Sequence, residues 1–376
     1  LGFTKKEHAR VSRILDDVKA RGDQALVDYT RRFDAPAYSL KDMPVQKREL
    51  AAAKSSADRT FLRSLNRAAA QIETFHRHQL RSGFVSLDRP GTMLGQLVRP
   101  VERVGVYVPG GTGGRTPLVS SVLMGAIPAK VAGVEQIIMV TPPTADGRVN
   151  PHLLVAARRA GVDEVYKVGG AWAVAALAFG TATIPKVDVI VGPGNLYVAL
   201  AKKIVAGSVG IDIIAGPSEV LVIADDSADP EFIAADLLAQ AEHDASASAV
   251  LVTTSAVLAA SVRSEMERQL AELDRADIAR ASIKRFGAVF VTSDVTRAID
   301  LSNRMAPEHL ELHLRDPFTR LGQIRNAGAV FIGEYTPEPV GDYMAGPNHV
   351  LPTAGTARFA SALSVDHFLK RTSIIH

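Results

Sequence analysis

The sequence predicts an α/β protein whose parallel sheet is covered by helices on both faces. First, short and nearly continuous apolar runs alternate with helical patterns from Val101 to Asp225, as is typical of strands buried on both faces. Second, several of these runs end in glycines, the usual sequence at the ligand-binding edge of such a sheet. Third, amphipathic helical patterns come before the first strand, so additional N-terminal helices are expected.

The N-terminal part is expected to be helical. Residues 5–33 show apolar residues at helical spacing, and Gly22 divides them into two helices. A further amphipathic helix is expected over residues 57–79, followed by a strand-like segment over 88–100.

The central part alternates strand and helix. The helix over 150–161 carries its own boundary signals, with Asn150 as N-cap, Pro151 in the first turn and Gly161 as the stop. Strands are expected within 103–111, 136–143, 164–170, 187–195 and 211–225, with helices over 117–133, 150–161, 171–180 and 196–207.

The second half shows a similar alternation with fewer glycines, starting with a helix capped by Asp229 and opened by Pro230. A long Gly- and Pro-rich stretch at 333–361 is expected to hold little regular structure, and loops of this length are often functional. The other expected elements are strands at 249–253, 288–292 and 328–333 and helices at 256–273 and 295–304.

Composition narrows the class of protein. The 376 residues are 47% hydrophobic and 22% charged, enough for two domains or one large α/β unit. The net charge is +3, and basic residues are scattered among acids, which argues against a nucleic-acid partner. No signal peptide or membrane-spanning run is seen, so a cytoplasmic protein without membrane partners is expected. The absence of cysteine excludes disulfides, cysteine-bound metals and a thiol intermediate.

Four glycine-rich segments end or follow the expected strands, at 108–114, 168–170, 192–195 and 215–218. Glycine lets the backbone approach a ligand, and following helix N-termini attract phosphate, so a nucleotide-sized ligand is favoured over tight turns alone. No strand–GxGxxG–helix fingerprint is present, which argues against a standard Rossmann pyrophosphate site.

Polar residues crowd the end of one apolar helix. Gln240 and His243 are three residues apart and would share a helix face, where a neutral oxygen and an imidazole suit a metal. The same pattern also fits satisfied core residues or a solvated helix end. Glu242 points elsewhere and would at most orient a ligand.

Two further groups could do chemistry. Glu308 and His309 are adjacent ahead of an apolar strand-like run, which suits paired acid–base work but equally a capped helix start. Asp342 and His349 lie in the long irregular stretch, where they fit either a site or a turn former and a surface residue.

Seven long motifs occur along the chain: "GVYVPGG", "VLMGAIPAKVAGV", "IVGPGNLYVALAKK", "GIDIIAGPSEVLVIAD", "AADLLAQAEHD", "APEHLEL" and "GDYMAGPNHVLPT". Through them the sequence resembles the histidinol dehydrogenase family over nearly the whole chain, from about Lys5 to the end. The resemblance implies two intertwined Rossmann-like, aldehyde-dehydrogenase-like domains. One would comprise residues 1–92 with 223–376, and the other, binding NAD, residues 93–222. It also implies a homodimer with composite active sites.

The resemblance implies NAD-linked oxidation of L-histidinol to L-histidine through a bound aldehyde, with a zinc ion that positions the substrate. Zinc ligands would be Gln240, His243 and Asp342, and the acid–base pair Glu308 and His309. NAD contacts would be Tyr107, Asn195 and Trp172, and substrate contacts Ser218, Gln240, His243, His309, Asp342 and His349.

The chemistry of these residue types agrees with such a reaction. Oxidising the alcohol requires a base for the hydroxyl proton, and His309 suits this near neutral pH. Since the chain has no cysteine, water must attack the aldehyde carbon, and Glu308 is the natural group to deprotonate it.

The sequence departs from the family at three places. Trp172 stands where the family usually has a glutamine that contacts NAD, and it would either stack on a nucleotide or fill space. Arg115 lies in a slightly longer loop, which could alter substrate choice. In the family, a segment beyond the position of His376 supplies another zinc-ligand histidine and a substrate-binding glutamate. The alternatives are a paralogue that oxidises another polar alcohol and a non-catalytic ligand-binding relative.

Overall fold

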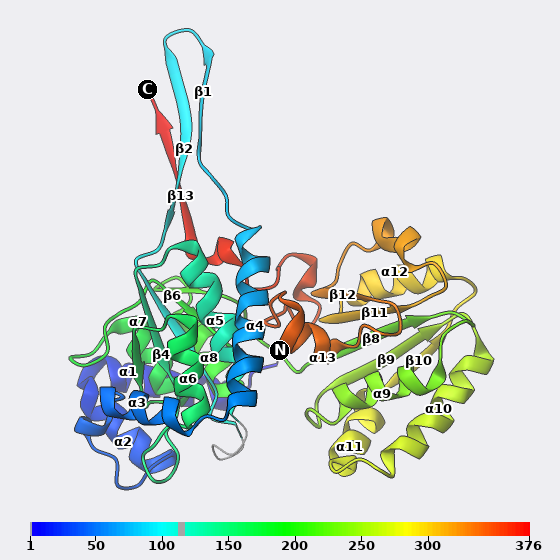
Figure 1. Ribbon diagram of the computed structural model, residues 1–376, viewed down its shortest axis with the longest axis horizontal. Helices are drawn as coiled ribbons and strands as arrows, with labels where there is room; N and C mark the ends of the chain where they lie inside the picture. Colours follow the sequence, from blue (N-terminus) through cyan, green and yellow to red (C-terminus); the bar gives the residue numbers. More distant parts are fainter. Residues whose placement is uncertain (1, 112–116) are drawn as a thin grey trace. The chain divides into compact units, whose positions relative to one another are not determined.

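The computed structural model describes residues 2–111 and 117–376, which fall into two compact units (Figure 1). The N-terminal unit comprises Gly2–Ile214, Tyr343–Val350 and Leu363–His376, and the C-terminal unit Ala215–Asp342 and Leu351–Ala362. The segments of the two units alternate along the chain, as expected for intertwined domains. Arg115 lies outside the described residues.

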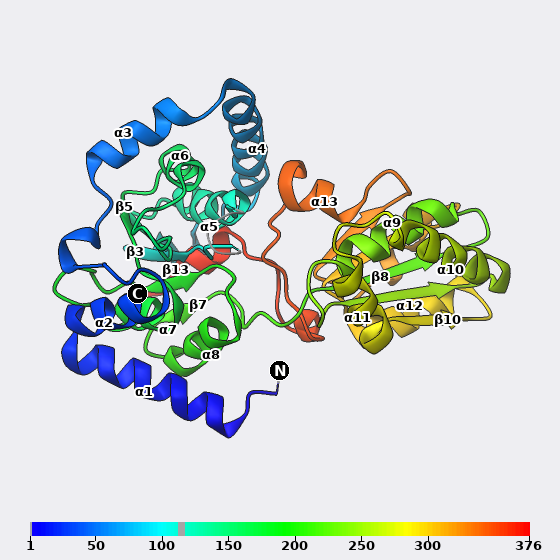
Figure 2. The ribbon, with the colours of Figure 1, turned by 90° about the horizontal axis from the view of Figure 1, so that it is seen from below.

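The N-terminal unit is built on a parallel sheet with strand order β5-β4-β3-β6-β7. The short strands are almost wholly apolar because helices cover both faces. Helices α5 and α6 pack together with α3 and α4 outside them, whereas α7 and α8 pack together with α1 (Figure 2). The strands are β3 (Arg103–Tyr107), β4 (Gln136–Val140), β5 (Glu164–Tyr166), β6 (Val189–Val191) and β7 (Gly210–Ile211). The helices are α1 (Lys5–Arg21), α2 (Asp23–Phe33), α3 (Lys47–Ser56), α4 (Arg59–Arg77), α5 (Val119–Ala132), α6 (Pro151–Ala160), α7 (Gly170–Phe179) and α8 (Leu196–Val205).

Local signals fix where the helices begin and end. The Thr4 hydroxyl accepts a hydrogen bond from the amide of Glu7, whose side chain in turn accepts one from the amide of Thr4, a reciprocal cap for α1. Helix α6 starts at the expected Asn150 cap and ends at Gly161, whose φ of 79° is the left-handed conformation that favours glycine.

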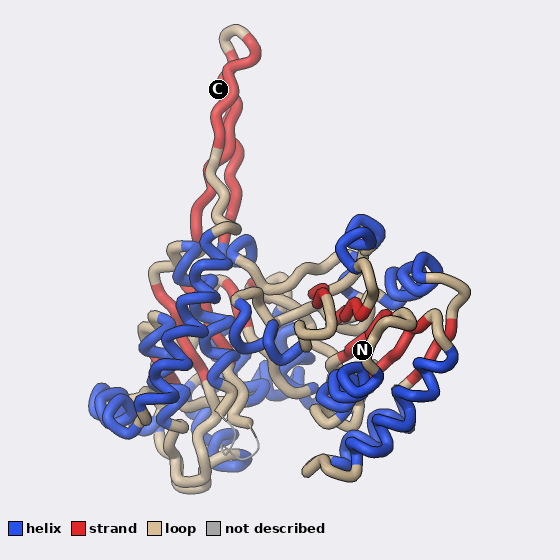
Figure 3. The backbone as a smooth tube through the Cα atoms, turned by 45° about the vertical axis from the view of Figure 1, so that its right-hand side comes forward, coloured by secondary structure: helices blue, strands red, loops and turns tan. Residues whose placement is uncertain are grey.

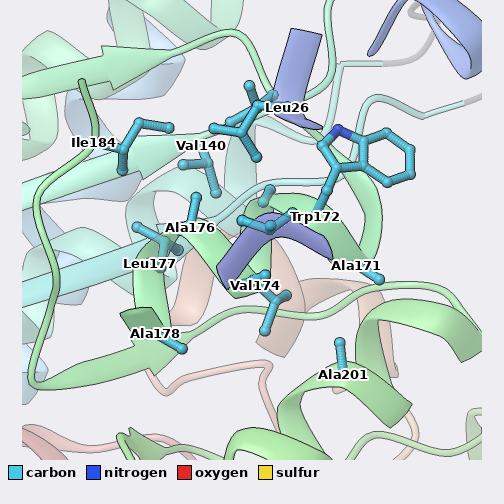
Figure 4. Packing of buried hydrophobic residues seen from close by; sticks show 14 of the residues in the cluster. Leu26, Val140, Ala171, Trp172, Val174, Ala176, Leu177, Ala178, Ile184 and Ala201 are labelled. Atoms are coloured by element: carbon cyan, nitrogen blue, oxygen red, sulfur yellow. The ribbon is translucent and has the colours of Figure 1, made fainter. Parts of the chain in front are cut away.

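Helix α7 is apolar all round because it lies between the sheet and the N-terminal helices. Leu26 of α2, Val140 of β4 and Trp172 of α7 belong to the same buried cluster (Figure 4). Helices α1 and α2 therefore complete the N-terminal unit. Their packing differs from the expected division, which grouped residues 1–92 with 223–376.

The C-terminal unit repeats the same topology. Its parallel sheet has the order β10-β9-β8-β11-β12, so in both sheets the first strand in the chain pairs with the second and the fourth. Alternate residues of β8 contribute to two apolar clusters, one with α9, α10 and α11 and the other with α12. The elements are β8 (Glu219–Ala224), α9 (Pro230–Ala241), β9 (Ser248–Thr253), α10 (Ala256–Leu270), α11 (Ala276–Phe286), β10 (Ala288–Val291), α12 (Val295–Met305), β11 (His309–His313) and β12 (Ala329–Ile332).

The parallel sheets and alternating helices confirm the predicted fold class. Helices α3 and α11 were not expected, and the helix expected over 256–273 ends at Leu270. The long Gly/Pro-rich stretch contains only short pieces, including α13 (Glu338–Val340) and one π-helical turn at Gly341–Ala345.

Three antiparallel strands form an arm on the N-terminal unit: β1 (Phe84–Arg89), β2 (Thr92–Pro100) and β13 (Leu369–Ile375). Figure 3 shows this arm extending away from the helices of that unit. Its apolar side chains are largely uncovered, with Leu87 70% exposed and both Phe84 and Val85 59% exposed. Among the described residues, the helices are too short or too polar to traverse a lipid bilayer.

Candidate active site

The pair Glu308–His309 opens strand β11 in the C-terminal unit. Helix α12 stops at Ala306, which takes a left-handed φ of 53°, and the chain enters the sheet three residues later, at His309. Glu308 is 6% and His309 3% exposed. Glu308 and His309 therefore do not form the capped helix start that the sequence also allowed. Both side chains are buried at the amino end of an interior strand.

The backbone of Glu219 holds both members of this pair. The Nδ1–H group of His309 donates to the carbonyl oxygen of Glu219 at 2.9 Å, and the amide of Glu219 donates to Oε2 of Glu308 at 2.9 Å. Because Nδ1 faces a carbonyl oxygen, it carries the proton, and Nε2 of the neutral ring is left as the basic nitrogen. Within the described residues Nε2 has no hydrogen-bond partner.

Two carboxylates lie near the basic nitrogen. Nε2 of His309 is 3.7 Å from Oδ1 of Asp342 and 3.9 Å from Oε1 of Glu338, and the three residues form a group compatible with a metal ion. Burial lowers the pKa of His309, but its interaction with Asp342 and the charges of Glu308 and Glu338 outweigh burial and raise the pKa to about 10. The imidazole therefore sits in a strongly electronegative environment.

Glu308 titrates close to neutral pH. Burial raises its pKa to about 7 against the opposing effect of His309. The neighbouring Glu219 is also held in place, since its Oε1 accepts from the amide of Ala354 at 3.0 Å. A carboxyl group poised near pH 7 suits proton transfer to or from water.

Glu338 is a site residue that the sequence did not reveal. It begins α13, and its amide donates to Oε1 of the buried Glu311 at 3.1 Å. Burial and the adjacent Asp342 raise its pKa to about 8. Its position four residues before Asp342 was the available signal, but the surrounding stretch shows no periodicity.

Gln240 and His243 do not share a helix face, because α9 ends at Ala241. Gln240 is 3% exposed, and its Oε1 has no hydrogen-bond partner within the described residues. His243 lies beyond the helix end and is exposed, and it is in neither group of metal-competent side chains in the described chain. The structure thus groups Asp342 with His309 and Glu338, and leaves Gln240 with an unsatisfied buried oxygen.

Ser218 and the Glu308–His309 pair lie at the amino ends of two neighbouring strands of the C-terminal unit, β8 and β11. Ser218 directly precedes β8 and is half-buried, and His309 pairs in register with Val220 at the start of that strand. The segment 215–218 therefore leads into a strand, whereas it was expected to follow one.

In the N-terminal unit, the residues expected to contact NAD line one cavity of about 590 Å³. The hydroxyl of Tyr107, at the end of β3, accepts from the amide of Gly170 at 3.1 Å, and burial raises the pKa of Tyr107 to about 12. The side chain of Asn195 caps α8 through the amides of Tyr197 and Val198. The volume and the aromatic lining suit a nucleotide.

Trp172 packs against α2 and also lines this cavity. Its indole N–H donates to Oγ1 of Thr30 at 3.2 Å, and its ring stacks on Phe33 at 5.4 Å between centroids. The residue is 7% exposed. Trp172 therefore fills space between α2 and α7 and also presents part of its surface to the cavity.

The glycines after the strands of this unit allow close backbone approach. A Cβ at Gly192, whose φ is 112°, would lie 2.1 Å from the carbonyl oxygen of Tyr107. Beneath it, the buried Lys202 pairs with Asp212 and donates to the carbonyl oxygen of Gly192 at 2.9 Å. His349 belongs to the N-terminal unit and is half-buried.

Comparison with solved structures first defines the class. An acetylating aldehyde dehydrogenase from Geobacillus thermoglucosidasius, 12% identical, has a TM-score of 0.54 over 99% of this chain and 97% of its own. This likeness shows the aldehyde-dehydrogenase-like fold alone.

Closer comparisons define the family. The family model described as histidinol dehydrogenase matches residues 3–376. Histidinol dehydrogenase of Desulfotalea psychrophila is 55% identical over 97% of this chain and 84% of its own length, and that of Clostridium acetobutylicum is 52% identical over 99% and 86%. The crystal structure of histidinol dehydrogenase from Elizabethkingia anophelis has a TM-score of 0.95 and 40% identity, over 100% of this chain and 86% of its own. The chain belongs to the histidinol dehydrogenase family and is an oxidoreductase.

Proposed function

We propose that this protein oxidises L-histidinol to L-histidine in histidine biosynthesis, with NAD as the hydride acceptor and zinc as the substrate-holding metal. The observation that carries the proposal is the imidazole of His309. Its basic Nε2 is buried and lacks a hydrogen-bond partner in the described residues, and its Nδ1 lies 3.8 Å from Oε2 of Glu308. L-histidinol is proposed as the substrate because the chain is 55% identical to a histidinol dehydrogenase.

In the first half-reaction, His309 accepts the hydroxyl proton of histidinol while hydride leaves the same carbon, which gives the aldehyde. The hydrogen bond from Nδ1–H to the carbonyl oxygen of Glu219 keeps Nε2 as the basic nitrogen and stabilises the imidazolium that forms.

In the second half-reaction, Glu308 removes a proton from water as the water oxygen bonds to the aldehyde carbon. The resulting anion of the hydrate loses a second hydride, for which a second NAD would be the acceptor, and the carboxylic acid that forms ionises to the carboxylate. The raised pKa of Glu308, about 7, makes it a more effective base than an exposed glutamate while leaving it substantially ionised above neutrality.

The proposed ligands carry donor atoms of the kinds that zinc binds. The buried, unpartnered Oε1 of Gln240 and the carboxylate of Asp342 offer oxygen ligands, and His243 is proposed as the nitrogen ligand. When bound, the metal supplies positive charge that holds the imidazole and amine of the substrate. Neutralising the carboxylates near His309 lowers the pKa of this histidine toward the range in which it acts as a base. Ser218 and His349 are proposed to contact the substrate.

The cavity of the N-terminal unit fits NAD in size and lining, with Tyr107, Trp172 and Asn195 on its wall. NAD, when bound, accepts the hydride. A homodimer is proposed to assemble through the arm, because isolated exposed apolar strands are unusual in a monomer. The cytoplasm is the proposed location.

Substrate oxidation tests the proposal directly. The zinc-loaded protein should reduce NAD with L-histidinol and not with a panel of polyols and other amino alcohols. Reduction of NAD with another polar alcohol but not with histidinol would identify a paralogue. Absence of turnover with any of these alcohols would contradict the proposal.

A further inference from the structure

The cavity of the N-terminal unit contains a carboxylate to which no role has yet been given. Asp34 follows the last residue of α2 and lines the same wall as Phe33 and Trp172. Its backbone amide is fixed by a hydrogen bond to the carbonyl oxygen of Thr30 at 2.9 Å. The side chain is thus held at the cavity by a helix terminus.

One oxygen of the Asp34 carboxylate lacks a hydrogen-bond donor. Oδ2 of Asp34 is buried and has no hydrogen-bond partner within the described residues. Burial raises the pKa of Asp34 to about 6, and no cation among the described residues opposes that effect. A buried acceptor without a donor is unfavourable. A ligand that donates a hydrogen bond to Oδ2 of Asp34 would therefore gain binding affinity.

The other charged residue of the described lining is Arg10, which contacts Tyr197 of the same lining. Its guanidinium lies over the ring of Tyr197 at 5.1 Å and donates to the hydroxyl of Tyr197 at 3.3 Å. The lining therefore offers a positive group for phosphates at Arg10 and a negative acceptor at Asp34. The aromatic pair Phe33–Trp172, with an interplanar angle of 22°, forms a rigid apolar surface next to the acceptor.

We propose that Asp34 accepts hydrogen bonds from the ribose hydroxyls of the adenosine half of the dinucleotide and so selects NAD over NADP. This inference rests on the proposed function. An ionised carboxylate only accepts hydrogen bonds, and a vicinal diol supplies two donors to one carboxylate. A phosphate on the 2′-oxygen would remove one donor and place like charges together in a poorly solvated cavity.

The test uses Trp172, the single tryptophan of the chain, whose ring lines the cavity and whose fluorescence reports nucleotide binding. NAD and NADP are titrated into the full-length zinc-loaded protein and into Asp34→Asn. The wild type should bind NAD at least 100-fold more tightly than NADP. In Asp34→Asn the Kd for NAD should rise about ten-fold and that for NADP should fall, so that the preference drops at least 30-fold.

Two variants sharpen this comparison. Asp28→Asn removes a carboxylate that also lies on α2, with a side chain 42% exposed and paired with Arg21, and it should leave the preference unchanged. Asp34→Ser provides a second neutral replacement if the asparagine variant fails to fold.

Failure of this inference can be told apart from failure of the proposed function. An unchanged NAD-to-NADP preference in both Asp34 variants would overturn the ribose assignment, and so would an equal loss of affinity for both nucleotides, which indicates contact with the adenine. In either case wild-type turnover of L-histidinol with NAD would remain. A wild-type protein that binds neither nucleotide would contradict the proposed function and this inference together.

Discussion

His309 and Glu308 are neighbours in the sequence, yet their environments suit them to different tasks. The carbonyl oxygen of Glu219 fixes the proton of His309 on Nδ1, and the amide of the same residue fixes Glu308. One backbone unit of β8 therefore sets both the tautomer of the base and the orientation of the carboxylate. This arrangement is consistent with the proposal that the two consecutive residues serve successive proton transfers.

Glu308→Gln should separate the two half-reactions. The amide keeps the hydrogen-bond acceptor for Glu219 but cannot deprotonate water, so aldehyde oxidation should slow by about 10²- to 10⁴-fold while alcohol oxidation is less affected. Rapid-mixing experiments with limiting histidinol should show one fast equivalent of NADH and a slow second one. Equal slowing of both equivalents would contradict the role given to Glu308.

His309→Asn should slow the first hydride transfer by about 10²- to 10⁴-fold, with little change in the KM for histidinol. The variant with an amide at this position keeps a donor for the carbonyl oxygen of Glu219 but offers no basic nitrogen. Adding the aldehyde in place of histidinol should restore much of the rate. A variant as active as the wild type would exclude His309 as the base.

Asp34→Asn should also change stability in a pH-dependent way in the absence of nucleotide. The folded pKa of Asp34, about 6 against an ordinary value of 3.8, is raised, so the wild type loses stability as pH rises through that range. Asparagine carries no charge at any of these pH values, so Asp34→Asn does not lose stability over this range. Its free energy of unfolding should exceed that of the wild type by about 1–2 kcal/mol at pH 8, after discounting for partial exposure, and match it near pH 4. Urea denaturation at both pH values measures this difference, and a constant difference would argue against an unpaired carboxylate.

At the scale of elements, strand β11 displays a buried polar face. His309, Glu311 and His313 alternate along it, while Leu310 and Leu312 face an apolar cluster. Nε2 of His313 is 3.5 Å from Oδ2 of Asp236 and 3.6 Å from Oε2 of Glu311. Burial lowers the pKa of His313, but these two carboxylates outweigh burial and raise it to about 9. Oε1 of Glu311 also accepts a hydrogen bond from the amide of Glu338, the first residue of α13.

Glu311→Ala should therefore destabilise the protein through two losses. The amide of Glu338 loses its acceptor, and the buried His313 loses one of its carboxylates, for a combined cost of about 3 kcal/mol. Glu311→Gln keeps the acceptor and should cost less. Chemical denaturation of both variants measures the difference, and equal stability of the alanine variant and the wild type would refute this role.

The sequence predicted the elements better than the site. Periodicity located most strands and helices because burial on both faces leaves long apolar runs. Gln240 and His243 were expected on one helix face, but α9 ends at Ala241 with no glycine or proline to mark it. Glu338 was missed because the turn that carries it is held by Glu311 from a distant strand, a long-range contact that leaves no local pattern.

At the scale of the whole molecule, the chain builds the same strand order twice and uses opposite edges of the two sheets. The lining of the nucleotide-sized cavity follows the carboxyl ends of strands in the N-terminal unit, as doubly wound sheets generally do. The proposed acid–base pair lies at the amino end of β11 and is held by the first residue of β8 in the C-terminal unit. The glycine-rich segments therefore predicted the position of the cavity but not that of Glu308 and His309.

The arm belongs to this scale because it is the interface proposed for the homodimer. Leu87→Glu places a charge on an exposed apolar strand, with Leu87 70% exposed, and should shift the protein from dimer to monomer in sedimentation velocity. The matched change Ser86→Ala should leave the dimer intact. A dimer that persists in Leu87→Glu would move the proposed interface away from the arm.

The central claim is that one centre carries out two successive oxidations with water as the oxygen source. The most direct measurement is the number of NADH molecules formed per molecule of L-histidinol consumed by the zinc-loaded protein, with L-histidine quantified in the same sample. The account predicts two NADH and one histidine per histidinol. One NADH with accumulation of the aldehyde, or none, would contradict it.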